Sequence, residues 1–440
     1  MSKSKNNICV IGLGYVGLTL SISLARSGFK VFGVEVNNEI LNNLNKNKST
    51  FYEPDINKNI RLVKKNFFFK KNISNSWNCC TYIITVGTPL NSKKKSRTDL
   101  IENAVKTIYY HLKENDLVIL RSTVKVGTTE NLVKSILDKK KINYYLAYCP
   151  ERTAEGKALH EIKNLPQIIG GIDKPSSKLC INIFSKITNN IVEVSNTRTA
   201  EMIKVIDNTQ RDTFFAFSNE VSTICNNFNI SATEVINSCN YKYPRSNLAM
   251  PGPVAGPCLS KDAYILSESI NKKLKLNNLL SMTGRKINEN IPSEIISFIK
   301  TVFNKKKKLK IALMGISFKG NPLTSDTRDS FSVSFLRKLQ SSFSGGIFYG
   351  YDPMVVANIF RRIKLKKVSS IRSVFKKTDI VFILNNNKNF SKLKLRNLSR
   401  IMKKSVLIYD CWKLYNKNSL NLLNGTQYIS FGNHYVYNKK

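Results

Sequence analysis

Residues 7–17 read NICVIGLGYVG, in which an apolar stretch runs directly into the pattern G-x-G-x-x-G. The residues before the glycines have the composition of a buried strand, and those after them have the apolar spacing of a helix. In such a turn Gly12 permits the tight bend, Gly14 lets a phosphate approach the backbone, and Gly17 allows the helix to pack closely. The stretch therefore predicts the strand–turn–helix of a dinucleotide-binding α/β domain, with the helix N-terminus facing the phosphates.

The residues that follow support this interpretation. A second strand is expected at Lys30–Val36, and it contains Glu35, 18 residues beyond Gly17. A carboxylate there can accept hydrogen bonds from the ribose hydroxyls, which favours NAD over NADP. A glycine-rich turn with a purely structural role would show the same glycine pattern. Here, however, a strand, a helix, a second strand and an acidic residue follow one another in the expected order. A Walker-type loop is excluded because no G-K-[ST] follows the glycines.

Further strands are expected at Tyr82–Val86, Leu117–Arg121 and Tyr145–Tyr148, alternating with helices. This alternation predicts a parallel, doubly wound sheet whose ligands bind at the carboxyl ends of the strands. Polar residues follow these strands, and each such segment taken alone could also be ordinary turn chemistry. The segments are Gly87-Thr88-Pro89, Ser122-Thr123 and Pro150-Glu151.

Composition restricts the class of protein. A chain of 440 residues with 42% hydrophobic content should form two or three domains. The nine cysteines lack metal-site spacing, which fits a reducing compartment, and we expect a cytoplasmic protein. Glycines interrupt the apolar stretch 8–25, so we expect neither a signal peptide nor a membrane span.

The formal net charge of +41 would by itself suggest nucleic acid or an anionic surface. The lysines are spread along the whole chain, and no nucleic-acid-binding motif accompanies them. The short runs Lys93–Lys95 and Lys305–Lys308 fall in an expected loop and an expected linker. We therefore expect no nucleic-acid partner, and an anionic nucleotide substrate instead.

Two features could carry chemistry. Cys258 lies in a Gly/Pro-rich segment, residues 251–262, that would hold a thiol exposed, whereas structural cysteines are usually buried. Lys204, Asn208 and Asp212 recur every four residues on an expected helix and form one polar stripe, which a solvated helix face would also explain.

With these features the chain resembles the UDP-glucose/GDP-mannose dehydrogenase family over nearly its whole length. The matching motifs are GLGYVG (12–17), VGTPL (86–90), RSTVKVGTT (121–129), PERTAEGKAL (150–159), AEMIKVIDN (200–208), GPVAGPCLSKD (252–262), GISFKGNPLTSDTRDS (315–330) and YDP (351–353).

The resemblance implies two Rossmann-like doubly wound α/β domains joined by a central helical segment. We expect an NAD-binding domain at 1–197, a helical dimerisation domain with the cysteine loop at 198–300, and a UDP-binding domain at 301–440. Strands of the last domain are expected at Lys310–Met314, Gly346–Tyr351, Asp379–Leu384 and Val406–Tyr409. The expected assembly is a homodimer.

The implied reaction is a four-electron oxidation of the C6 alcohol of a UDP-sugar to a carboxylate, with two NAD consumed. Cys258 matches the nucleophile that captures the aldehyde as a thiohemiacetal, which is oxidised to a thioester and hydrolysed. Lys204 and Asn208 match the pair that stabilises the oxyanion. Asp262 and Thr123 match groups that organise water in the proton-transfer steps.

The resemblance also places the remaining contacts. Glu151 and Glu155 match the glutamates of P-E-x-x-x-E-G, the first being the expected general base for thioester hydrolysis. Substrate contacts are expected from Glu151, Glu155, Lys204, Arg245, Phe318, Lys319 and Arg328. Cofactor contacts are expected from Gly12, Gly14, Tyr15, Val16, Gly17, Glu35, Thr88 and Thr123. No metal is expected.

Two departures from the family pattern bear on function. The cysteine is preceded by Ala255-Gly256-Pro257, where the family usually has G-G-H or G-G-x, so an inactive or non-enzymatic dinucleotide-binding homologue remains an alternative. Glu151 is followed by Arg152-Thr153, where UDP-glucose enzymes usually carry Phe-Leu. Arg152 favours the UDP-N-acetylhexosamine branch, with UDP-N-acetylmannosamine or UDP-N-acetylglucosamine as substrate and surface polysaccharide as the destination; UDP-glucose is the alternative.

Overall fold

The computed structural model describes residues 6–270, 279–303, 308–416, 420–423 and 425–434. The chain divides into two compact units, Met1–Asn208 with Tyr264–Lys275, and Thr209–Ala263 with Leu276–Lys440. The expected linker at Lys305–Lys308 lies, except for Lys308, outside the described residues.

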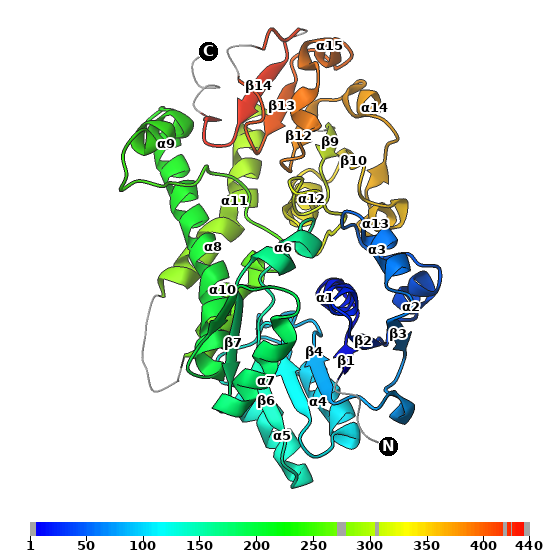
Figure 1. The fold of residues 1–440 in the computed structure, drawn as a ribbon. Coiled ribbons are helices and arrows are strands. Elements are labelled where there is room, and N and C mark those ends of the chain that lie inside the picture. The colour runs from blue at the N-terminus through cyan, green and yellow to red at the C-terminus, as the bar shows by residue number, and fades with distance from the viewer. Residues whose placement is uncertain (1–5, 271–278, 304–307, 417–419, 424, 435–440) are drawn as a thin grey trace. The chain divides into compact units, whose positions relative to one another are not determined.

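The first unit is built on an eight-stranded sheet in the order β3-β2-β1-β4-β5-β6-β7-β8 (Figure 1). Its strands are β1 (Asn7–Ile11), β2 (Lys30–Val34), β3 (Phe67–Lys70), β4 (Thr81–Ile84), β5 (Leu117–Leu120), β6 (Tyr145–Tyr148), β7 (Gln167–Gly171) and β8 (Ile191–Glu193). Its helical elements are α1 (Tyr15–Arg26), α2 (Asn38–Asn45), α3 (Ile56–Leu62), η1 (Asn75–Trp77), α4 (Asp99–His111), η2 (Thr129–Lys134), α5 (Ser135–Leu137), η3 (Asp138–Lys140), α6 (Ala158–Asn164) and α7 (Lys174–Phe184).

Helices cover both faces of this sheet, so the side chains on both sides of its strand β1 are buried. Alternate residues of β1 enter different cores: Ile8 and Val10 pack with α1 and α7, whereas Cys9 and Ile11 pack with α4. Since successive side chains of a strand point to opposite faces, a strand buried on both sides reads as a continuous apolar run. The expected strands of this domain are confirmed to within two residues at each end.

One strand departs from the parallel pattern. β7 pairs antiparallel to β6, and β8 pairs parallel to β7. The connection between β6 and β7 carries α6, which packs against α1, and so it does not form the crossover that a parallel β6–β7 pair would need. The sheet is therefore parallel from β3 to β6 and mixed beyond β6.

The second unit contains a six-stranded parallel sheet in the order β11-β10-β9-β12-β13-β14. Its strands are β9 (Lys310–Met314), β10 (Ile347–Tyr351), β11 (Lys366–Lys367), β12 (Ile380–Ile383), β13 (Leu407–Asp410) and β14 (Gln427–Ser430). Its helical elements are α9 (Ala232–Asn240), α11 (Leu280–Val302), α12 (Phe331–Ser342), α13 (Ala357–Arg362), α14 (Ile371–Phe375), η4 (Phe390–Lys392) and α15 (Leu395–Ser399).

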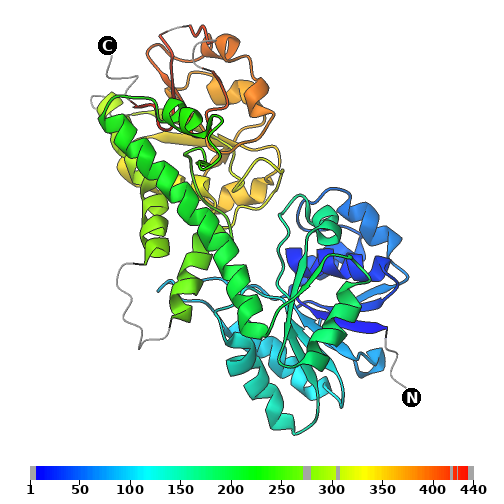
Figure 2. The same cartoon turned by 60° about the vertical axis from the view of Figure 1, so that its left-hand side comes forward.

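Two helices contribute residues to both units. α8 (Thr197–Asn227) is one uninterrupted helix, drawn in green in Figure 2, and α10 (Leu259–Ser269) begins directly after Cys258. Between Thr199 and Pro292 the described chain is helical or irregular, which fits the helical segment expected at 198–300.

In both units the turn after the first strand of the sheet is held by the same kind of hydrogen bond. The Oε2 of Glu35, just after β2, accepts a hydrogen bond from the backbone N of Leu13 at 2.8 Å. The Oδ2 of Asp352, just after β10, accepts bonds from the backbone N of Ile316 at 2.7 Å and of Ser317 at 2.9 Å. In each unit an acidic residue after the second strand thus stabilises the turn after the first.

Candidate active site

The glycine turn after β1 has the geometry that its sequence predicted. Gly12 has a φ of +94°, a region that residues with a side chain rarely adopt. A Cβ at Gly17 would lie 1.8 Å from the carbonyl oxygen of Gly12, whereas a Cβ at Gly14 would meet nothing within 4 Å. The turn therefore needs glycine at 12 and 17 for its own shape, and the open space at Gly14 leaves room for a pyrophosphate.

The residues around this turn fit NAD. Glu35 accepts hydrogen bonds from the backbone of Leu13 and, at 2.9 Å, of Asn37, so its carboxylate lies beside the glycine turn at the carboxyl end of β2. A carboxylate there is suited to ribose hydroxyls and repels a 2′-phosphate. Tyr15 and Val16 begin α1 directly after the turn, at the end of the helix that favours anions.

The ends of β4 and β5 are tied together by side-chain hydroxyls. Thr88 donates to the carbonyl oxygen of Thr123 at 2.6 Å, and Ser122 donates to that of Val86 at 2.6 Å. Thr88 is buried and Thr123 is partly exposed. The two predicted residues thus lie side by side at the carboxyl edge of the sheet.

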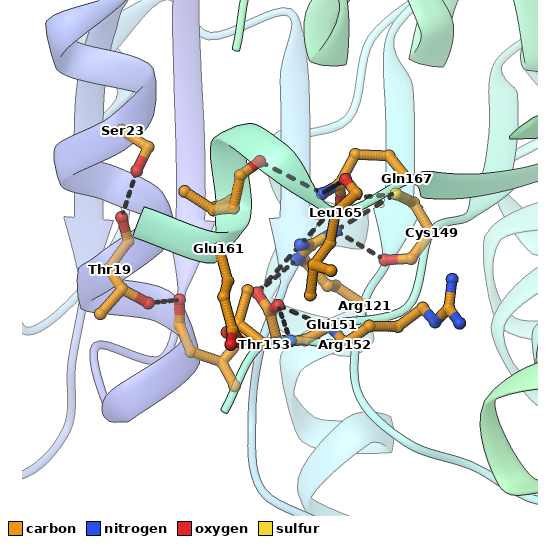
Figure 3. A network of polar contacts seen from close by, with 12 residues as sticks. Thr19, Ser23, Arg121, Cys149, Glu151, Arg152, Thr153, Glu161, Leu165 and Gln167 are labelled. Carbon is orange, nitrogen blue, oxygen red and sulfur yellow. Dashed lines mark hydrogen bonds and ion pairs between the residues drawn. The ribbon is translucent and has the colours of Figure 1, made fainter. Parts of the chain in front are cut away.

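Glu151 is enclosed in a polar network after β6 (Figure 3). Its Oε2 accepts from Nη2 of Arg121 at 2.9 Å and from Nε at 3.3 Å. Its Oε1 accepts from the backbone N of Arg152 at 2.8 Å and of Thr153 at 2.9 Å. Burial would raise the pKa of Glu151, but the Arg121 charge and the Thr153 backbone bond outweigh it and lower the pKa. To accept a proton, Glu151 must therefore give up one of these bonds.

The first half of α8 is docked onto the loops that follow β5 and β6. Glu201 accepts hydrogen bonds from the backbone N of Thr129 at 2.8 Å and from its hydroxyl at 2.6 Å. Asp207 forms an ion pair with Arg152 at 2.9 Å. Lys204 and Asn208 lie on the same part of α8, and each is 8% exposed. The helix thus presents the two predicted oxyanion-binding residues within the same unit as Thr123 and Glu151.

A second network connects the glycine helix to the P-E-x-x-x-E-G segment. The hydroxyl of Tyr15 donates to the buried carboxylate of Glu53, and both groups accept from the backbone N of Gly156 at 2.8 Å. Gly156 directly follows Glu155, which is partly exposed. The position of the loop with both glutamates is therefore coupled to the first turn of α1.

In the second unit Cys258 is exposed and immediately precedes the first residue of α10. The start of a helix is the positive end of the helix dipole, which suits a thiolate. The loop is braced at Gly256, whose backbone N donates to the carbonyl oxygen of Asp329 at 2.9 Å. A Cβ at Gly256, which has a φ of +100°, would lie 2.5 Å from the Phe318 ring. Phe318 thus packs directly against the cysteine loop.

The other predicted residues of this unit differ in exposure. Lys319 is partly exposed with its ammonium 5.3 Å from the centre of the Phe318 ring. Arg328 is exposed and pairs with Asp326 at 2.6 Å. Asp262, one turn into α10, is buried and accepts from Lys261 at 2.8 Å.

Arg245 lies apart from these contacts. It is exposed and donates to the Tyr243 hydroxyl at 3.0 Å. The predicted residues therefore fall into two sets, one in each unit. The first set is Gly12, Gly14, Tyr15, Val16, Gly17, Glu35, Thr88, Thr123, Glu151, Glu155, Lys204 and Asn208, and the second is Arg245, Cys258, Asp262, Phe318, Lys319 and Arg328.

Sequence reasoning missed four buried charged residues that brace these loops: Glu53, Arg121, Glu201 and Arg285. Arg121 lies inside a quoted motif, and a cation in an apolar strand is a signal that it needs a buried partner. Glu201 also lies inside a quoted motif, but nothing else in the sequence distinguishes it, Glu53 or Arg285 from a surface charge.

Three family models match consecutive parts of the chain. The NAD binding domain of the UDP-glucose/GDP-mannose dehydrogenase family matches residues 6–188, the central domain matches 198–290, and the UDP binding domain matches 312–417. A UDP-N-acetyl-D-mannosamine dehydrogenase of Methanococcus maripaludis is 31% identical over 93% of this chain and 93% of the relative. The chain belongs to the UDP-glucose/GDP-mannose dehydrogenase family.

It is an NAD-dependent nucleotide-sugar dehydrogenase, as the sequence motifs predicted. A UDP-N-acetyl-D-mannosamine dehydrogenase of Methanocaldococcus jannaschii is 32% identical over 94% of this chain and 92% of its own. The structure of the UDP-D-ManNAc dehydrogenase of Pyrococcus horikoshii superposes with a TM-score of 0.86 at 26% identity, covering 97% of this chain and 99% of that one.

A second solved structure, that of the UDP-N-acetyl-mannosamine dehydrogenase of Staphylococcus aureus, superposes with a TM-score of 0.84 at 27% identity and covers 98% of this chain and 99% of that one. The family fold, two parallel-sheet domains with a long central helix, is thereby confirmed. Among the described residues, no helix has the length and apolar character needed to cross a membrane.

Proposed function

We propose that this enzyme oxidises UDP-N-acetylmannosamine at C6 to the uronic acid in two successive steps. The observation that carries the chemistry is the exposed thiol of Cys258 at the start of α10, in a chain that belongs to this family. The proposed sugar is supported by the names of relatives that match over most of their length, and by Arg152 beside Glu151.

NAD bound at the Gly12–Gly17 turn would accept the hydride in each of the two oxidations. The protein's own groups are proposed to act as follows. The Cys258 thiolate adds to the C6 aldehyde, forming a C–S bond and a thiohemiacetal oxyanion. Lys204 and Asn208 donate hydrogen bonds to that oxygen. After the second oxidation, water activated by Glu151, and organised by Thr123 and Asp262, cleaves the thioester and frees the thiol.

The remaining residues are proposed to bind substrate. Glu155, Arg245, Phe318, Lys319 and Arg328 would contact the nucleotide-sugar, and the cationic groups among them suit its phosphates. The three segments 1–197, 198–300 and 301–440 are proposed as the cofactor, dimerisation and UDP-binding domains.

We further propose a homodimer formed through α8. An apolar row follows the outer face of this helix in alternate steps of three and four residues, at Phe214, Phe217, Val221 and Ile224, and continues at Phe228, the residue directly after the end of the helix. Phe214 and Phe217 are each 52% exposed, Ile224 is 51% exposed and Phe228 is 69% exposed. A row with this spacing is suited to a second helix, and exposed apolar rows of this size usually mark an interface. None of the nine cysteines forms a disulfide, and this favours the cytoplasm as the place of action.

The test is NADH formation by the purified protein with UDP-N-acetylmannosamine, UDP-N-acetylglucosamine, UDP-glucose and GDP-mannose in parallel. We expect two NADH for each UDP-N-acetylmannosamine consumed, and loss of the second oxidation in Cys258→Ser. Turnover of UDP-glucose alone would replace the proposed sugar. Absence of turnover with all four would contradict the proposal and support an inactive homologue.

A further inference from the structure

The loop that carries Cys258 is held at its beginning by a buried asparagine of α8. The Oδ1 of Asn219 accepts from the backbone N of Gly252 at 2.8 Å, and its Nδ2 donates to the carbonyl oxygen of Gly252 at 3.1 Å. The same Nδ2 donates to Oδ1 of Asn288 on α11 at 2.8 Å. Asn219 and Asn288 are each 2% exposed, so these bonds do not compete with bulk water.

A buried arginine of α11 holds the loop on both sides of the cysteine. Nη1 of Arg285 donates to the carbonyl oxygen of Leu259 at 3.0 Å, and Nη2 donates to that of Val254 at 3.4 Å. Leu259 directly follows Cys258, and Val254 precedes it by four residues. One rigid guanidinium therefore fixes the two ends of the short segment in which the thiol lies.

The guanidinium is itself fixed from α8. Nη1 of Arg285 also donates to Oδ1 of Asp212 at 2.8 Å, and Nδ2 of Asn288 donates to the same oxygen at 2.8 Å. Arg285 and Asp212 are each 1% exposed. Removing the arginine would leave a buried carboxylate without its cation. Lysine would keep the charge but could not reproduce the planar arrangement of donors.

We propose that Arg285, supported by Asn219 and Asn288, is a positioning group for Cys258, and that it fixes the segment 254–259 so that the thiol meets the aldehyde of the substrate. This inference rests on the proposed thiohemiacetal chemistry. It assigns a role to residues that touch neither substrate nor cofactor.

The physical consequence is specific to one half of the reaction. The first oxidation converts an alcohol to an aldehyde and makes no bond to sulfur. The second requires the thiolate at bonding distance from C6. Since a displacement of about 1 Å at a reacting centre can cost roughly 100-fold in rate, loosening the segment should slow the second oxidation selectively.

The experiment is rapid-mixing NADH formation by the full-length protein, with UDP-N-acetylmannosamine, for wild type, Arg285→Lys, Asn219→Ala and Asn290→Ala. Asn290 lies on the same helix, is exposed, and donates a hydrogen bond from its side chain to Glu294. In Arg285→Lys we expect the first NADH to form at close to the wild-type rate and the second to form roughly tenfold more slowly or worse. Asn290→Ala should match wild type in both phases.

Equal loss in both phases would overturn the proposal, since a merely structural role lowers the amount of active protein and affects both alike. A second phase in Arg285→Lys that is as fast as in Asn290→Ala would also overturn the proposal. If Arg285→Lys does not fold, Asn219→Ala decides, because it leaves the Arg285–Asp212 pair intact and removes the bonds of Asn219 to Gly252 and to Asn288.

A second measurement separates this proposal from the proposed function. Iodoacetamide alkylation of Cys258, followed by mass spectrometry of its peptide, needs no substrate, and the half-buried Cys80 serves as internal reference. If wild type turns over none of the nucleotide-sugars, the proposed function fails and alkylation alone tests the positioning. Alkylation several-fold slower in Arg285→Lys than in Asn290→Ala would support it, and equal rates would overturn it.

Discussion

Nη2 of Arg121 lies 2.9 Å from Oε2 of Glu151, and both side chains are almost wholly enclosed. The same guanidinium donates to the carbonyl oxygen of Cys149 at 3.0 Å and to Gln167 at 3.1 Å. Arg121 thereby joins the ends of β5 and β6 to β7, the strand that reverses direction in the sheet. The residue expected to act as a general base is also part of the first unit's internal support.

Glu151→Gln should therefore lower the stability of the protein as well as its activity. Breaking a buried pair by removing one partner costs about 3–5 kcal/mol, because the remaining charge is left without compensation. We expect a fall of that order in the free energy of unfolding, measured by urea denaturation. Asp99→Asn, which breaks the exposed pair with Arg97, serves as the control and should have little effect. Equal effects of both changes would contradict this account.

The contribution of Asp212 should depend on pH in a defined direction. Burial raises the pKa of Asp212 to about 6, although the Arg285 charge and the Asn288 hydrogen bond lower it. The folded state then binds the proton more tightly than the unfolded state, whose Asp pKa is about 3.9. This contribution to stability is present at low pH and is lost as the pH rises through about 6.

Asp212→Asn removes that titration. The free energy of unfolding of wild type relative to Asp212→Asn should thus be larger near pH 4, at the lower end of the window between the two pKa values, than near pH 7, above that window. Urea denaturation at the two pH values measures this difference. A difference that does not change with pH would show that Asp212 does not titrate in this window.

Two glycines of the cofactor turn should respond differently to alanine. Gly17→Ala places a methyl group 1.8 Å from the carbonyl oxygen of Gly12, so the turn must distort and the protein should lose stability. Gly14→Ala meets no protein atom within 4 Å, so its thermal stability should stay near wild type while NADH binding weakens. Thermal unfolding and NADH fluorescence titration distinguish the two effects. Tight NADH binding by Gly14→Ala would place the pyrophosphate elsewhere.

Gly256→Ala should disable the cysteine loop. The new methyl group would lie 2.5 Å from the Phe318 ring, on a backbone with a φ of +100° that alanine rarely adopts. We expect loss of the second oxidation together with slower alkylation of Cys258. A wild-type rate in both assays would mean that the contact between Gly256 and Phe318 has no part in positioning the thiol.

The exposed row on α8 provides the test of the dimer. Phe217→Lys should shift the protein towards monomer in analytical ultracentrifugation, since a charge on an apolar helix seam is not compensated. Ile347→Lys is the matched control, because Ile347 is 62% exposed and lies on β10. A dimer that persists unchanged in Phe217→Lys would place the interface elsewhere.

The sequence alone determined the fold class and the order of the domains, and it predicted which loops are reactive. These depend on local patterns: the glycines at 12 and 17 because of backbone geometry, β1 because a strand buried on both faces is continuously apolar, and Cys258 because a Gly/Pro-rich segment exposes its thiol. Each pattern spans a few neighbouring residues, so it can be read without knowing what packs against it.

Only the tertiary structure decided which side chains meet. Arg121 and Glu151 are separated by 30 residues, and Arg285 and Asp212 by 73 residues. The antiparallel pairing of β7 could not be predicted from the sequence either. The run QIIGG indicates a buried strand, but it does not indicate the direction of that strand in the sheet. These residues pair because every buried charge and polar group needs a hydrogen-bond or ion-pair partner. Which partner is available depends on how the whole molecule packs.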